Sequence, residues 1–236
     1  MPPSVDRLVT ELQGVFGPRL RSVALYGGSA QLGDPAGQAD HRIHTLAVVD
    51  QLPPSDLRAC AGLAGAWHKR GLAMPLLLTF ADLQRSLDAF PMEFDQILAD
   101  HTTVHGDDPL AGLSVADGDV RRACETQARS HALHLRESYL ECGADAKALA
   151  RLIAASAAPF RALLASVARL HGEHGPFDDA AVARVADRAG LEAGVIRQVL
   201  AAAHGRSVAA ADAESLYPAY LAAAESLVRH VDAWRA

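Results

Sequence analysis

Hydrophobic residues in the first half of the chain follow two different periods. Over 4–16 they recur every three or four positions, which predicts an amphipathic helix. Short, nearly continuous apolar runs such as 43–49 instead predict buried strands. The same patterns predict helices over 4–16, 55–70 and 81–89, and strands over 22–29, 43–49, 74–80 and 102–105. Alternating helices and strands are typical of an α/β domain.

Helical periodicity continues alone beyond residue 119. Glycines such as Gly143, Gly190 and Gly205 divide it into segments. The pattern predicts helices over 119–142, 144–171, 178–189, 192–204 and 211–235. Helices joined by short connections form bundles. A stretch with proline and glycines at 109–118 marks a boundary, so we expect an α/β domain over 1–112 and a helical bundle domain over 113–236.

Composition narrows the range of partners. The chain is 50% hydrophobic, enough for a sizeable core, and its net charge is −6. Proteins that bind nucleic acids or membrane surfaces usually present a basic face, so this charge argues against both partners. The three cysteines are widely spaced and form neither a disulfide framework nor a metal motif. Because the sequence shows no leader pattern and no apolar run of roughly 18 residues, we expect a cytoplasmic protein.

A glycine turn after the first predicted strand carries the candidate chemistry. The strand runs into Gly27-Gly28-Ser29, and thirteen residues, 29–41, then separate Gly28 from Arg42. The next strand begins around Arg42-Ile43-His44. This order resembles the nucleotidyltransferase superfamily, which includes polymerase beta and the antibiotic adenylyltransferases. In that family the glycine turn precedes an acid–apolar–acid triplet on a buried strand.

Further segments are similar to a bacterial subset of the same superfamily, which pairs this domain with a C-terminal helical region. They lie at 75–79, 85–94 and 105–110. The resemblance covers 20–112 well and the helical half loosely. It implies a nucleotidyltransferase-like mixed sheet with flanking helices, followed by an all-α bundle.

The triplet is altered where the family carries its metal-binding acids. Side chains two apart on a strand face the same way, so two carboxylates placed there can hold Mg²⁺ together. Arg42 and His44 occupy those two positions here. An arginine repels a cation, and a unit charge about 4 Å away is worth roughly 4 kcal/mol near a protein surface. We therefore expect no bound magnesium and no metal-dependent transfer, as in a pseudoenzyme.

The resemblance implies that the altered site binds a ligand without reacting with it. Gly27, Gly28 and Ser29 would face phosphates through their backbone N–H groups. Arg42 and His44 would line the former metal site. The expected ligand is ATP, another nucleotide or another anion, with no cofactor. A protein partner, including a second copy of the chain, is the other interpretation.

One catalytic alternative is an active nucleotidyltransferase that uses displaced acids. Asp34 and Asp40 lie in the loop before the second strand, and Asp107-Asp108 follows the last one. The superfamily often carries a third acid on a later strand, but the predicted strand over 74–80 has no acid.

A second alternative is a helical-domain ribonuclease. Arg129 and His134 resemble the short motif of HEPN ribonucleases, in which His134 would exchange a proton near the 2′-hydroxyl. His131 instead falls on the inward face of the same helix. Other histidines are expected to bind no metal, because too few further ligands accompany them. They are His41, His44, His101, His105, His171 and His174.

Overall fold

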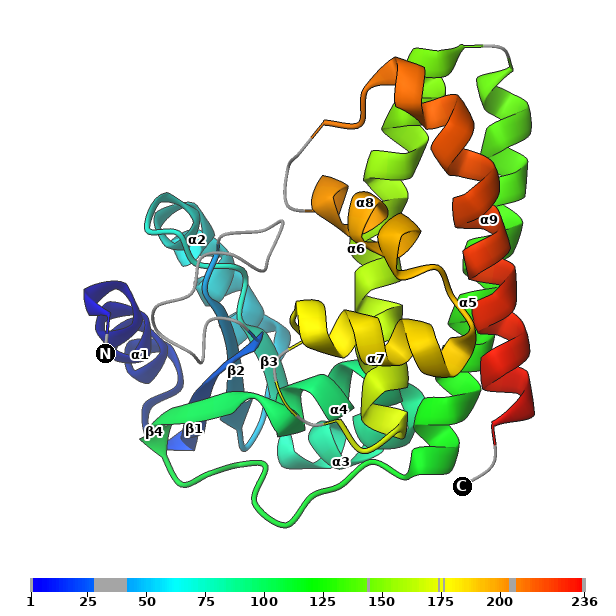
Figure 1. The fold of residues 1–236 in the computed structure, drawn as a ribbon. Helices are drawn as coiled ribbons and strands as arrows, with labels where there is room; N and C mark the ends of the chain where they lie inside the picture. Colours follow the sequence, from blue (N-terminus) through cyan, green and yellow to red (C-terminus); the bar gives the residue numbers. More distant parts are fainter. Residues whose placement is uncertain are drawn as a thin grey trace. The chain divides into compact units, whose positions relative to one another are not determined.

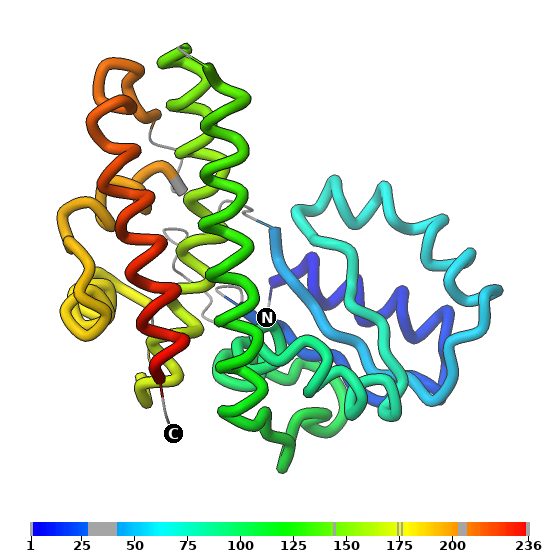
Figure 2. Tube along the Cα trace, turned by 90° about the vertical axis from the view of Figure 1, so that its right-hand side faces the viewer, coloured from blue at the N-terminus to red at the C-terminus, as the bar shows by residue number. Residues whose placement is uncertain are grey.

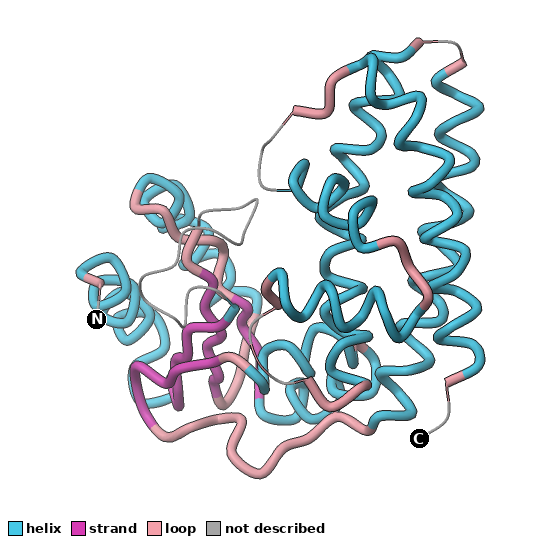
Figure 3. Tube along the Cα trace, viewed as in Figure 1, coloured by secondary structure: helices cyan, strands magenta, loops and turns pink. Residues whose placement is uncertain are grey.

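The structure is a computed structural model that describes residues 2–27, 42–143, 145–173, 175, 177–203 and 207–234. The chain forms two compact units, Met1–Val115 and Ala116–Ala236. Within the described residues, strands occur in the first unit only, and the second is built from helices (Figure 3). The predicted fold class, an α/β region followed by a helical one, is confirmed.

A four-stranded mixed sheet forms the centre of the first unit (Figure 1). Its order is β3-β2-β1-β4, with β1 antiparallel to both β2 and β4, and β3 parallel to β2. The strands are β1 (Leu20–Tyr26), β2 (His44–Val49), β3 (Leu76–Thr79) and β4 (His101–Gly106). The two central strands are more buried than the two edge strands. This burial explains why 43–49 is almost continuously apolar.

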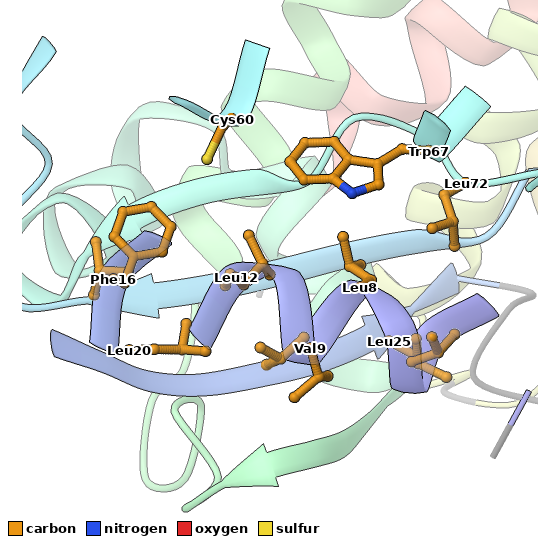
Figure 4. Close-up of a cluster of buried hydrophobic side chains, with 13 residues drawn as sticks. Leu8, Val9, Leu12, Phe16, Leu20, Leu25, Cys60, Trp67 and Leu72 are labelled. Atoms are coloured by element: carbon orange, nitrogen blue, oxygen red, sulfur yellow. The ribbon is translucent and has the colours of Figure 1, made fainter. Parts of the chain in front are cut away.

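Helices α1 (Pro3–Phe16) and α2 (Pro54–Lys69) cover one face of the sheet, and the short 3₁₀ turn η1 (Gly17–Arg19) leads from α1 into β1. Figure 4 shows their apolar side chains pointing toward one another over the strands. Glu11 joins the two helices, because its carboxylate accepts hydrogen bonds from Trp67 Nε1 at 2.8 Å and Arg70 Nη2 at 2.6 Å. The Arg70 hydrogen bond lowers the pKa of Glu11, which keeps the carboxylate charged.

Helices α3 (Phe80–Ala89) and α4 (Pro91–Ala99) pack on the other face of the sheet. A capping box between Thr79 and Asp82 starts α3. No helix was predicted over 91–99, because the predicted helix over 81–89 ended before Phe90-Pro91. Pro91 is instead the first residue of α4, where a proline needs no N–H partner and its fixed φ favours the helix.

The second unit consists of helices packed against one another. They are α5 (Asp117–Cys142), α6 (Ala146–Leu170), α7 (Asp179–Ala189), α8 (Ala193–Ala203) and α9 (Ala210–Ala233). Helices α5 and α9 run side by side, as Figures 1 and 2 both show, and α6 packs against each of them. These bounds agree with the five predicted helices apart from small shifts at their ends.

Among the described residues one helix, α6, is long and apolar enough to cross a membrane, judged by length and composition alone. The core helix of a bundle passes the same test. Helix α6 packs against α5, α8 and α9, and residues along its whole length are buried within the unit.

A buried polar chain crosses the helical unit. His131 on α5 is 7% exposed and stacks on Phe160, with ring centroids 5.0 Å apart. Its Nε2 lies 2.8 Å from the Tyr220 hydroxyl, which donates to Ser156 Oγ at 3.1 Å, and Ser156 Oγ donates to the Ile153 carbonyl at 3.0 Å. A neutral His131 that donates from Nε2 satisfies every member of this chain. Burial lowers the pKa of His131 to about 4, which keeps it neutral.

The lowered pKa of His131 predicts a loss of stability in acid. The unfolded chain takes up a proton near the ordinary value of 6.5, whereas folded His131 does so only near 4. Stability from this residue is therefore complete above pH 6.5 and falls by up to about 3 kcal/mol as the pH drops toward 4. Urea unfolding from pH 7 to pH 4 should show a shallower decline for His131→Gln. The exposed neighbour variant His134→Gln should retain the wild-type slope, and equal slopes for all three proteins would contradict this account.

Candidate functional site

Strand pairing places the candidate residues at one end of the sheet. Tyr26 at the end of β1 lies opposite His44 at the start of β2. Their rings are 5.6 Å apart between centroids and inclined by 49°. Side chains alternate along a strand, so His44 lies on the same face as Leu46 and Val48, the face covered by α3 and α4.

A cavity of about 450 Å³ opens at this end of the sheet, within the first unit. Strands β1, β2 and β3 form one wall, and α3, α4 and the turn between them form the other. Its described lining residues are mostly apolar: Tyr26, Gly27, His44, Leu76, Leu78, Ser86, Phe90, Glu93, Phe94, Gln96 and Ile97. Burial raises the pKa of the Tyr26 phenol, so its hydroxyl stays protonated and able to donate.

Gly27 continues the pairing of β1 with the start of β4. Its N–H donates to the Asp100 carbonyl at 3.1 Å, so this N–H is not available to a phosphate. Its φ of 67° lies in the left-handed region that favours glycine. Gly28 and Ser29, the other two residues of the predicted phosphate-facing turn, lie outside the described residues.

Arg42 and His44 contact different parts of the first unit. Arg42 precedes β2, and its Nη1 lies 3.2 Å from His68 Nε2 near the end of α2. Because an arginine only donates, the His68 nitrogen is the acceptor. His44 lines the cavity, whereas Arg42 is not among the described lining residues. His44 therefore lies beside Tyr26 and lines the same cavity as Gly27, whereas Arg42 contacts His68 of α2.

The described residues do not fit a magnesium site. Glu93 is the one carboxylate among the described lining residues, and β3 carries no acid. Across the described part of the chain, no group of three or more His, Cys, Asp or Glu side chains is placed to hold a metal ion. Proteins usually hold Mg²⁺ through one or two carboxylates together with waters, and the pair of carboxylates that the superfamily resemblance implies is replaced here by Arg42 and His44.

The structure describes two of the four acids that an active transferase was predicted to use, Asp107 and Asp108. Asp34 and Asp40, like His41, lie outside the described residues. Asp108 is engaged locally, because its Oδ1 lies 3.2 Å from His101 Nε2 and accepts the Leu110 N–H at 2.9 Å. The backbone carbonyl of Asp107 accepts the Ser22 hydroxyl at 2.6 Å. Asp100, which directly precedes β4, is a further acid that the sequence analysis did not name. Burial raises the pKa of its carboxyl group.

The candidate ribonuclease residues form surface ion pairs. Arg129 contacts Glu125 at 3.2 Å and Asp232 at 3.0 Å. His134 Nδ1 lies 3.2 Å from Glu137, and the His134 side chain is 74% exposed. The described contacts of each residue are thus with acidic side chains on the surface of the bundle. His131 is buried, as its position on the inward face predicted.

His171, at the end of α6, contacts a histidine that was not predicted as its partner. His171 Nε2 lies 2.8 Å from His230 Nε2 on α9, and burial lowers the pKa of both. His174 lies outside the described residues. His171 and His230 are 59 residues apart in the sequence, so no local sequence pattern predicts their contact.

Comparisons with known proteins support the fold. No model of a protein family matches the chain, and no curated protein matches it in sequence. The chain is similar to a solved spectinomycin adenyltransferase from Enterococcus faecialis, whose structure contains ATP and spectinomycin. The likeness has a TM-score of 0.59 at 12% identity and covers 97% of this chain and 98% of that one. The fold is nucleotidyltransferase-like. At this identity the similarity extends to the fold alone, which does not fix function.

The backbone of Gly27 can be tested by substitution. Gly27→Ala should lower the unfolding free energy by about 1 kcal/mol, because an L-residue is strained at this positive φ. Gly65→Ala is the matched control, since Gly65 lies inside α2 with nothing within 4 Å of an added Cβ. It should raise stability by about 0.5–1 kcal/mol. Urea unfolding measures both, and the same sign of change for both variants would contradict the assignment at Gly27.

Proposed function

We propose that this protein uses a nucleotidyltransferase-like fold to bind a nucleotide or another phosphate-bearing anion, without metal-dependent transfer. The observation that carries the proposal is the identity of positions 42 and 44. Where the superfamily resemblance implies two carboxylates, this chain has a cation and an imidazole. An anionic ligand is attracted by the Arg42 guanidinium, whereas a divalent ion is repelled by it.

Arg42 is the residue expected to contact the anion. It lies just before β2, at the end of the sheet where β1 runs into the glycine turn. Its guanidinium can donate paired hydrogen bonds to phosphate oxygens, and such charge-assisted bonds are stronger than neutral ones. His68 supports the arginine through its ring nitrogen. Gly28 and Ser29 enter the proposal on sequence alone, and the bonded N–H of Gly27 gives that residue a role in shape only.

ATP is the first ligand to test, because the solved adenyltransferase of similar fold contains it. Calorimetric titration of the full chain with ATP should give the same affinity with Mg²⁺ as with EDTA. Arg42→Ala should weaken binding roughly tenfold, the loss expected for a hydrogen bond to a charged group. Arg58→Ala is the matched control, because Arg58 is an exposed arginine of α2 outside the cavity lining, and it should bind ATP normally.

Three outcomes would contradict the proposal. Binding that requires Mg²⁺ would show that a metal site remains. Transfer of label from [α-³²P]ATP to an acceptor or to the protein would show an active transferase. Absence of binding by any nucleoside triphosphate would remove the nucleotide as the ligand.

A further inference from the structure

The cavity beside β2 has a chemistry that an anion site at Arg42 does not explain. Three aromatic residues, Tyr26, Phe90 and Phe94, line it together with the carboxylate of Glu93. Neither lysine nor arginine occurs among its described lining residues. We infer that this cavity binds an organic ammonium ion, a small molecule with a cationic amine on an apolar body. This inference goes beyond the proposed nucleotide site, which lies at Arg42 outside the cavity lining.

Glu93 gives the cavity its charge. It stands in the first turn of α4 and forms no hydrogen bond or ion pair within the described part of the chain. Glu93 is an exposed residue, so its carboxylate lies at the solvent-facing rim of the cavity and attracts a cation there.

The aromatic residues select the kind of cation. Ammonium groups are attracted to the faces of aromatic rings, and cavities with several rings recognise alkylated amines in this way. Phe90 is 57% exposed although it is a large apolar residue, and it lines the cavity between α3 and α4. A bound ligand would cover this surface, which packing within the unit leaves open.

The remaining lining residues determine which uncharged groups the ligand can carry. Leu76, Leu78 and Ile97 supply apolar walls, and a polyhydroxylated cation would leave hydroxyl groups unpaired against them. The polar residues Ser86 and Gln96 also line the cavity, and the Ser86 hydroxyl donates to the Asp82 carbonyl at 2.8 Å. A volume of about 450 Å³ suits a molecule with one or two rings. A metal cation does not fit, because no three metal-ligating side chains converge within the described residues.

Three probes of similar shape separate charge from shape. They are 2-phenylethylammonium, the neutral 2-phenylethanol and the anionic 3-phenylpropionate, each titrated into the full chain at pH 7 by calorimetry or ligand-observed NMR. We expect the cation to bind in the millimolar range or tighter, roughly tenfold better than the alcohol, with the anion weakest. Equal binding of the three probes, or no binding by any of them, would overturn the inference.

Two variants assign the binding to this cavity. Glu93→Gln keeps the side-chain shape and should reduce the affinity for the ammonium probe to that for the alcohol. Ser86→Trp should fill the cavity and abolish binding of all three probes. Asp88→Asn removes an exposed acid of α3 outside the lining and should change nothing. Unchanged ammonium binding in Glu93→Gln would place the cation elsewhere and overturn the inference, whether or not the tryptophan variant folds.

The same variants keep this inference separate from the proposed nucleotide site. Glu93→Gln should bind ATP at least as well as the wild type, because it removes a negative charge. Arg42→Ala should bind the ammonium probe normally. Ammonium binding without ATP binding would contradict the proposed function alone, and the reverse result would contradict the cation site alone.

Discussion

The pairing of β1 with β2 is the constraint on which the site depends. Both strands are buried in the middle of the sheet, and their register sets Tyr26 opposite His44. Both faces of β2 are buried, with Ala47 and Val49 packed in the core under α1 and α2, and Leu46 and Val48 packed against α3 and α4. In this register position 44 lies on the face covered by α3 and α4. In this chain that residue is a histidine, and it becomes part of a mostly apolar cavity.

The electrostatics of the site follow from the same constraint. Two carboxylates at positions 42 and 44 would share a face and could hold a divalent ion between them. Arg42 and His44 supply no such pair of carboxylates. Arg42 contacts His68, and the His44 ring lies beside that of Tyr26. At this end of the sheet the Arg42 guanidinium therefore lies outside the described cavity lining, and the Glu93 carboxylate lies at the rim of the cavity. These two charges suit ligands of opposite sign.

The sequence predicted the fold well because the elements carry strong periodic patterns. The helix over 4–16 is α1 almost residue for residue, and its buried side chains are the ones that its spacing indicated. Helix α4 was not predicted, because a proline both follows helices and begins them, and Pro91 begins one here.

The site was less predictable than the fold. The glycine turn and the altered triplet could be identified by their spacing in the sequence. Phe90, Glu93 and Phe94 line the cavity only because α4 packs against the sheet. Their chemistry is not visible in a local pattern. The separation of Arg42 from His44 depends on His68, which lies 26 residues from Arg42 along the chain. Such contacts are products of tertiary structure and cannot be derived from the triplet itself.

The central claim is that the end of β2 no longer holds a divalent ion, and Mn²⁺ binding tests it most directly. Calorimetric titration of the wild-type chain with Mn²⁺ should show no saturable site. The double variant Arg42→Asp with His44→Asp should gain one, because it restores two carboxylates at the start of β2. Saturable Mn²⁺ binding by the wild type that is lost in His44→Ala would contradict the account.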